Sequence, residues 1–143
     1  VSHQPVSLLL VDIDYFKRIN DTFGHDIGDF VLKELVATLK KLFMRESDIL
    51  ARIGGEEFAI LLPDFQVEHA LVKAEEVLER VRAEAYVHQD REIRFTVSIG
   101  ISQLAEGDSV ASWVKRADLA LYHSKNTGRN KVTVAPGPLK NVA

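Results

Sequence analysis

The sequence contains no cysteine among its 143 residues. This absence excludes disulfide bonds, thiolate zinc sites and cysteine nucleophiles, and it agrees with a cytoplasmic location. Long apolar runs are also absent: the longest are residues 8–11 and 58–62, far short of the roughly 20 residues that a membrane-spanning helix needs. We therefore expect neither a transmembrane helix nor a signal peptide in this chain.

Positive charge is not in excess, because 18 Lys and Arg stand against 21 Asp and Glu and give a formal charge of -3. Non-specific nucleic-acid binding depends on many Lys and Arg that release counterions, so no nucleic acid is expected as a partner. A small anionic ligand is compatible with this charge, because a local basic cluster can outweigh it.

The residues that are present suffice for one folded domain. Apolar residues make up 46% of the chain and charged residues 27%, as in ordinary soluble globular proteins. We predict one domain over residues 1–135 and a flexible tail over residues 136–143, which opens with Pro-Gly-Pro. The chain begins without Met, almost directly at a strand, which favours a fragment of a longer protein.

Apolar periodicity predicts strands at residues 7–13, 49–53, 58–62, 93–101 and 131–134, and helices at residues 15–23, 26–43, 70–81 and 110–121. The second and third strands flank Gly54 and Gly55, which are able to take the positive φ of a tight turn, so these strands form a hairpin. Interleaved helices and strands that include a hairpin predict an α/β (α+β) fold with a mixed sheet.

Charged side chains gather at the ends of three predicted elements: Asp12 and Asp14, Glu56 and Glu57, and Lys125 and Arg129. Carboxylates from two loops suit Mg²⁺, and basic residues in a glycine-bearing turn suit phosphates. Each pair also has a plainer interpretation: a solvated strand end, an ordinary hairpin turn, and a helix C-terminus that offsets its own dipole. Spacing alone leaves both interpretations open.

The residues of these segments resemble the motifs of the GGDEF family, the diguanylate cyclases. Residues 54–58 read GGEEF, a common form of the motif that names the family. The other segments follow in the order and approximate spacing of the family, and together they cover residues 7–134: DIDYFK at 12–17, ND at 20–21, GHDIGD at 24–29, VSIG at 97–100 and KNTGRN at 125–130.

The resemblance implies an enzyme that condenses two GTP molecules into cyclic di-GMP, a bacterial second messenger, and releases two pyrophosphates. It implies a central, mainly antiparallel sheet wrapped by helices, related to the nucleotidyl cyclase and polymerase palm. One pocket holds one GTP, so ring closure requires a second copy of the domain, face to face with the first and roughly two-fold related.

The resemblance also assigns roles to the acidic residues. Asp12 and Glu56 would bind Mg²⁺, or Mn²⁺ as an alternative, together with the backbone carbonyl of Ile13. Glu57 would be a further metal ligand or would help to deprotonate the attacking 3′-hydroxyl. Asp12, Glu56 and Glu57 are therefore the candidate catalytic residues.

Other matching positions would bind the substrate. Asn20 and Asp29 correspond to residues that recognise guanine, whose N1 and N2 hydrogens are donors to an acceptor such as a carboxylate. Without the motif, both would read as helix-terminal residues. Gly55 would let the hairpin backbone approach the nucleotide. The candidate phosphate-binding groups are Lys17, the backbone of Tyr15 and Phe16, Lys125 and Arg129.

Arg45 and Asp48 fit the family's RxxD inhibitory site, which binds the product just before the hairpin. Arg offers a fork of donors to phosphate or guanine, and Asp accepts from guanine. A lone RxxD more often forms a surface ion pair. Arg80 and Arg82 are both candidates to complete such a site.

The chain departs from the family pattern at its start, where it lacks the usual Leu-Thr-Gly-Leu-x-Asn-Arg segment and the helix before the first strand. We expect an upstream sensor or regulatory domain in the parent protein, which could be anchored in a membrane through that missing part. The alternatives are a chain inactivated by this truncation, a non-catalytic module that binds cyclic di-GMP or GTP, and a purely structural dimerisation domain.

Overall fold

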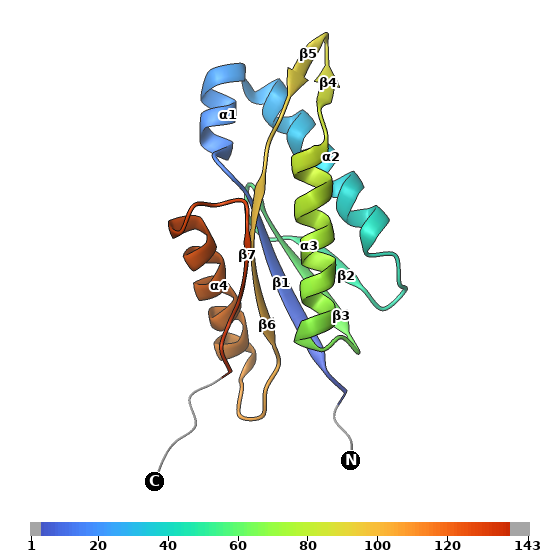
Figure 1. Ribbon diagram of the computed structural model, residues 1–143, viewed down its shortest axis with the longest axis vertical. Helices are drawn as coiled ribbons and strands as arrows, with labels where there is room; N and C mark the ends of the chain where they lie inside the picture. Colours follow the sequence, from blue (N-terminus) through green and yellow to red (C-terminus); the bar gives the residue numbers. More distant parts are fainter. Residues whose placement is uncertain (1–3, 138–143) are drawn as a thin grey trace.

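The computed structural model describes residues 4–137 (Figure 1). Of the predicted tail, only residues 136–137 are therefore included, and residues 138–143 lie outside the described part. The elements in chain order are β1 (Val6–Ile13), α1 (Phe16–Phe23), α2 (His25–Leu42), β2 (Ile49–Arg52), β3 (Glu57–Pro63), α3 (Val67–Ala83), β4 (Tyr86–His88), β5 (Arg91–Ile93), β6 (Val97–Gln103), α4 (Val110–Asn126) and β7 (Val132–Val134).

The centre of the fold is a five-stranded sheet in the order β2-β3-β1-β6-β7. Three of its pairings are antiparallel, and only β6 and β7 run parallel. That parallel pair is joined by α4, because parallel strands need a crossover connection. The predicted mixed, mainly antiparallel sheet wrapped by helices is confirmed.

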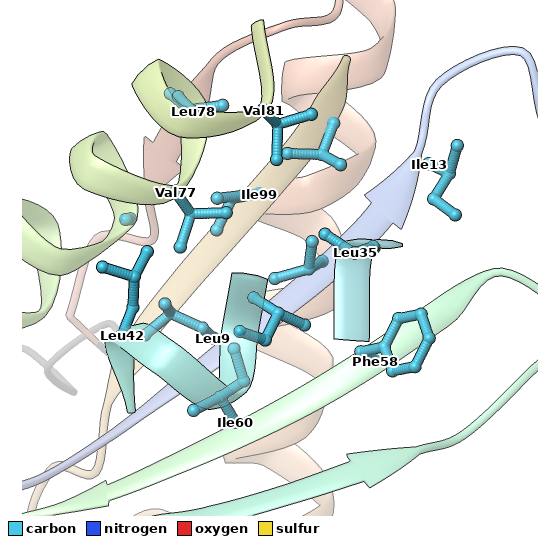
Figure 2. Close-up of a cluster of buried hydrophobic side chains, with 14 of the residues drawn as sticks. Leu9, Ile13, Leu35, Leu42, Phe58, Ile60, Val77, Leu78, Val81 and Ile99 are labelled. Carbon is cyan, nitrogen blue, oxygen red and sulfur yellow. The ribbon is translucent and has the colours of Figure 1, made fainter. Parts of the chain in front are cut away.

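Helices cover both faces of this sheet (Figure 1). Leu9 and Val11 of β1 join the core formed with α2 and α3, whereas Leu8 and Leu10 pack on α4, around Trp113. Figure 2 shows the larger core, in which Leu9, Ile60 and Ile99 of the sheet meet Leu35 of α2 and Val77 of α3. Burial on both faces explains why β1 reads as a continuous apolar run.

The contact between α4 and the sheet depends on Gly100 of β6. A Cβ atom at this position would overlap the backbone of α4 at Ala117 O and Leu121 N. The helix therefore lies directly on the strand, which no other residue type permits without a shift of the helix.

The prediction of one strand over residues 93–101 was wrong. β5 ends at Ile93 and β6 begins at Val97, while β5 pairs with β4 in a separate two-stranded hairpin. The apolar alternation misled because Ile93, Phe95 and Val97 are all buried in the same core. β4 was not predicted, because the turn that joins it to β5 has no glycine: Gln89 and Asp90 take its positive φ values.

The predicted positive φ at Gly54 and Gly55 was also wrong. Among residues 4–137, the glycines with positive φ are Gly24, Gly107 and Gly128. The hairpin is closed instead by Ile53 N and Gly54 N, which both donate to Glu57 O. Backbone angle therefore does not require glycine at either position, and a Cβ atom would fit at both: it would meet Glu57 Cβ at 3.6 Å at Gly54 and no atom within 4 Å at Gly55.

None of the helices within residues 4–137 combines the length and the apolar character that crossing a membrane requires.

Candidate active site

A hollow of about 320 Å³ lies where β1 leaves the sheet. The tip of the β2–β3 hairpin lies beside this strand end, because Ile13 N donates to Glu56 O at 3.3 Å. The start of α1 and the end of α4 provide the rest of the wall. Its lining residues are Asp12, Ile13, Asp14, Tyr15, Phe16, Lys17, Arg18, Glu56, Lys125 and Arg129.

Asp12, near the end of β1, is only 5% exposed. Lys125, in the last turn of α4, donates from Nζ to Asp12 Oδ2. Burial raises the pKa of the Asp12 carboxyl, and the hydrogen bond and charge of Lys125 oppose that rise. The structure therefore brings together one predicted metal ligand and one predicted phosphate-binding residue as a partly buried ion pair.

The two glutamates of the hairpin occupy different surroundings. Glu56 lines the hollow. Glu57 is paired with Asp12 across the β1–β3 ladder, which puts both side chains on the same face of the sheet. Burial, followed by the charge of Asp12, raises the pKa of Glu57. Burial of Glu57 therefore favours its protonated form.

Asp14 differs from Asp12 although both are buried. Its carboxylate accepts hydrogen bonds from Thr96 Oγ1 (2.7 Å), Ser98 Oγ (2.6 Å) and Asn130 N (2.9 Å). These three donors hold the carboxylate in place, and the bond from Asn130 N fastens the turn after α4 to the end of β1. The plainer interpretation of this pair, a solvated strand end, does not describe Asp14, because its carboxylate is buried and bound by protein donors.

The turn after α4 has an unusual backbone. Gly128, Arg129 and Asn130 all have positive φ (120°, 61° and 51°), which is uncommon for residues other than glycine. Arg129 Nη1 donates to Lys125 O at 3.1 Å. This turn directs Arg129 back toward the hollow and toward Tyr15, which itself has a φ of 56°.

The guanine-recognition candidates lie beyond the hollow, where α1 crosses α2. Asn20 packs against Gly28, where a Cβ atom would overlap Asn20 Oδ1. Asp29 follows Gly28 and is exposed. Phe16 links the two places, since it lines the hollow and its ring also borders Gly28.

Sequence reasoning missed Arg18, which lines the hollow together with the predicted Lys17. Both residues belong to the first turn of α1. The available signal was the Lys-Arg pair itself, directly after the predicted metal-binding strand end. Its meaning was hidden because the left-handed turn at Tyr15, which sets the direction of α1, has no glycine to mark it.

The family comparison agrees with this geometry. The family model for "Diguanylate cyclase, GGDEF domain" matches residues 1–131. The chain belongs to the GGDEF family. The family inferred from the sequence motifs is thereby confirmed.

Curated relatives with this GGDEF domain are longer proteins. Diguanylate cyclase A of Treponema denticola is 42% identical over 137 residues, which are 95% of this chain and 37% of that protein. Response regulator PleD of Caulobacter vibrioides is 46% identical over 131 residues, which are 90% of this chain and 29% of that protein. The chain thus spans about a third of the length of these relatives.

Solved GGDEF structures share the fold. The GGDEF domain of DgcB from Caulobacter crescentus, in complex with c-di-GMP, matches with a TM-score of 0.87 and 34% identity over 91% of this chain and 77% of that chain. The active GGEEF domain of a diguanylate cyclase from Vibrio cholerae matches with a TM-score of 0.86 and 37% identity over 94% of this chain and 85% of that chain.

The oxygen donors of this GGDEF domain fit Mg²⁺. Within residues 4–137 no three or more His, Cys, Asp or Glu side chains converge as a metal cluster. Mg²⁺ does not require one, because it usually binds one or two carboxylates and completes its shell with water and substrate phosphates. Asp12 and Glu56 supply two carboxylates to one hollow, beside the backbone of Ile13.

The RxxD residues form a tight pair away from the hollow. Arg45 Nε donates to Asp48 Oδ1 at 2.8 Å, and Arg45 Nη2 donates to Pro63 O at 2.8 Å. The guanidinium also lies over the ring of Phe65, 4.3 Å from its centre. The Arg45 side chain nevertheless keeps 37% of its surface exposed, against 5% for Asp48.

The predicted arginine partners of this pair lie toward the far end of α3. Phe65 precedes α3, and Arg80 and Arg82 belong to its last turn, roughly 20 Å away at 1.5 Å per helical residue. The α3 cation nearer to the pair is Lys73, whose Nζ donates to Leu42 O at 3.2 Å, close before Arg45.

Proposed function

We propose that this domain is a diguanylate cyclase domain that condenses two GTP molecules into cyclic di-GMP and two pyrophosphates. The observation that carries this proposal is that Asp12 and Glu56 line the same hollow as the cations Lys17, Lys125 and Arg129. Carboxylates for a metal beside cations for phosphates are what transfer of a nucleotidyl group requires.

Each group has a role in this proposal. Asp12, Glu56 and the Ile13 carbonyl hold Mg²⁺, which neutralises charge on the reacting phosphate when it is bound. Lys17, Lys125 and Arg129 bind the phosphates by charge-assisted hydrogen bonds, as do the backbone N–H groups of Tyr15 and Phe16. A methyl group at Gly55 would meet no atom within 4 Å, so the nucleotide can lie close to the hairpin.

Glu57 is suited to accept a proton from the attacking 3′-hydroxyl. Its pKa is raised by burial and by the charge of Asp12, and a base works best when its pKa approaches the working pH. Asn20 and Asp29 hold the guanine edge at the other end of α1. In this proposal Asp12 and Glu56 bind the metal, and Glu57 accepts the proton.

One domain holds one GTP, because a single hollow cannot present the 3′-hydroxyl of one nucleotide to the α-phosphate of another. Two domains in a face-to-face, two-fold arrangement align both pairs of reacting groups at once. The cytoplasm is the expected compartment, and residues 1–135 are the expected functional unit of a longer, regulated protein.

We also propose that cyclic di-GMP binds at Arg45 and Asp48 and inhibits synthesis. The exposed part of Arg45, held in place over Phe65, presents N–H donors that a phosphate or guanine can share. A GGDEF domain in complex with c-di-GMP is known for DgcB, which supports a product-binding role for the family member described here.

The decisive experiment is incubation of the chain at high concentration with GTP and Mg²⁺, followed by chromatographic detection of cyclic di-GMP. Glu56→Ala should abolish synthesis, whereas Glu79→Ala, at an exposed position of α3, should leave it unchanged. Product from Glu56→Ala would refute the role given to Glu56.

Absence of product from the wild-type chain would favour the alternative of a non-catalytic binding module. Calorimetric titration with GTP and with cyclic di-GMP would then measure binding directly. Repeating the synthesis assay with the longer parent protein separates a module without activity from a domain that needs the segment before β1.

A further inference from the structure

The ring of Tyr15 contacts two arginines. The guanidinium carbons of Arg18 and Arg129 each lie 4.5 Å from the centre of this ring. Arg18 belongs to the first turn of α1 and Arg129 to the turn after α4, so Tyr15 joins segments from opposite ends of the chain. Tyr15 is 49% exposed. Its ring is therefore not part of the hydrophobic core and packs against the two arginines instead.

Neither arginine is neutralised by a carboxylate. In the part of the chain that the structure describes, all salt bridges use other cations. The hydrogen bond that Arg129 makes goes to the neutral main-chain oxygen of Lys125. Each guanidinium has five N–H donors. A cation–π contact occupies none of these donors with a hydrogen bond. Most of this donor capacity is therefore available to an anion.

Both arginines face the proposed GTP site. They line the same hollow as Lys17, Asp12 and Glu56. The start of α1 adds unpaired backbone N–H groups, since Tyr15 precedes the helix without any side-chain cap. Positive groups from α1 and from the turn after α4 thus meet at the Tyr15 ring on the wall of the hollow.

We propose that Arg18, supported by Tyr15 beside Arg129, binds the outer phosphates of the nucleoside triphosphate and selects it over a monophosphate. This inference rests on the proposed function, which already gives phosphate binding to Arg129. Arg18 lines the same hollow as Arg129, so both guanidinium groups are placed to meet one bound ligand. A triphosphate offers this wall oxygen acceptors and charge that a monophosphate lacks, and an arginine fork binds such oxygens in pairs.

The test compares the binding of 3′-deoxy-GTP and GMP to the full chain in Mg²⁺ buffer by calorimetry. The 3′-deoxy nucleotide lacks the attacking hydroxyl, so no turnover disturbs the titration. Arg18→Gln should weaken 3′-deoxy-GTP about ten-fold, the scale of one charge-assisted hydrogen bond, and should leave GMP unchanged. Arg18→Lys keeps the charge without the fork and should recover part of the loss.

A second variant tests the role of the ring. Tyr15→Asn removes the aromatic support but suits the left-handed backbone, which Asn tolerates. It should weaken 3′-deoxy-GTP by about three-fold and again spare GMP. The matched control is Arg94→Gln, because Arg94 is an exposed arginine outside the hollow. Thermal unfolding of each variant checks that the fold is kept.

The outcomes separate the two proposals. Equal losses for 3′-deoxy-GTP and GMP, or no loss for either in Arg18→Gln, would overturn the role of Arg18. If the wild-type chain binds 3′-deoxy-GTP in that case, the GTP-binding part of the proposed function stands, and the synthesis assay with Glu56→Ala tests its catalytic part independently. A wild-type chain that binds neither nucleotide would overturn both. A selective loss of the triphosphate in both variants would establish the inference.

Discussion

Lys125, at the end of α4, donates a hydrogen bond to Asp12, near the end of β1. This contact joins the last helix of the domain to its central strand at the rim of the hollow. It also balances a carboxylate that is 5% exposed and that burial alone would drive toward its protonated form. The geometry of the proposed metal site and the stability of the strand end are thus linked through the same ion pair.

Replacing this lysine should produce a pH-dependent loss of stability. Lys125→Met leaves Asp12 buried without its cation, so the pKa of Asp12 rises further. A group whose pKa is raised on folding destabilises the native state as the pH rises through that pKa. We expect a loss of about 1–3 kcal/mol at pH 7 that shrinks toward pH 4.

Urea unfolding at both pH values, without divalent metal, measures this difference. Lys115→Met, at an exposed position of the same helix, is the control and should show little change. An equal loss at pH 7 and pH 4 would argue for lost packing instead of an unpaired charge.

A second ion pair should control stability in acid. Arg116 and Asp108 form a salt bridge at the start of α4, with Asp108 only 1% exposed. The hydrogen bond from Arg116 lowers the pKa of Asp108 to about 2. Its contribution is complete above the ordinary carboxyl pKa near 4 and is lost as the pH falls toward 2.

Thermal unfolding between pH 7 and pH 2 tests this assignment. Asp108→Asn should lower the midpoint at pH 7, and its difference from the wild type should narrow between pH 4 and pH 2. Glu106→Gln, an exposed neighbour, should follow the wild-type curve throughout. A constant difference across the whole range would contradict the ion-pair explanation.

The close approach of α4 to β6 should not tolerate a methyl group. Gly100→Ala would overlap Ala117 O and Leu121 N, both of which belong to helix backbone. We expect a loss of about 1–3 kcal/mol from overpacking, together with slower synthesis, because a displaced α4 moves Lys125. Gly137→Ala, where a Cβ atom meets nothing within 4 Å, is the control in chemical denaturation.

The RxxD pair should determine product affinity. Arg45→Ala removes the exposed N–H donors and should weaken cyclic di-GMP at least about ten-fold and relieve inhibition of synthesis. Arg45→Lys should resemble it, because Lys lacks the planar fork. Calorimetry with cyclic di-GMP gives the affinities, with Arg94→Ala as the matched surface control. Unchanged affinity in Arg45→Ala would reject this inhibitory site.

The sequence predicted the elements whose apolar pattern follows directly from burial. The apolar run of β1 and the helical repeat of α2 both correspond to burial, and burial is what periodicity measures. It failed at residues 93–97, where burial continues although the strand does not. Hydrogen-bond pairing, which separates β5 from β6, leaves no trace in the apolar pattern.

For the candidate site, too, the sequence predicted some residues and not others. The resemblance to the family motifs singled out Asp12, Glu56, Lys125 and Arg129, and the structure gathers all four around one hollow. Spacing could not separate Asp12 from Asp14, because their difference lies in partners contributed by distant segments. Nor could it single out Arg18, whose neighbour Arg129 comes close only through two left-handed turns, at Tyr15 and at Arg129 itself.

The direction of the strands has a practical consequence. β1 runs from Val6 toward the hollow, and β7 runs away from it. The start of β1 and the end of β7 therefore both lie at the end of the strands that is far from the hollow (Figure 1). A bead attached near either point would stand roughly 25 Å from the hollow, the length of an eight-residue strand. Immobilised copies would then present the hollow to the solution. Under the proposed face-to-face pairing of two domains, we expect their output of cyclic di-GMP to rise steeply with surface density.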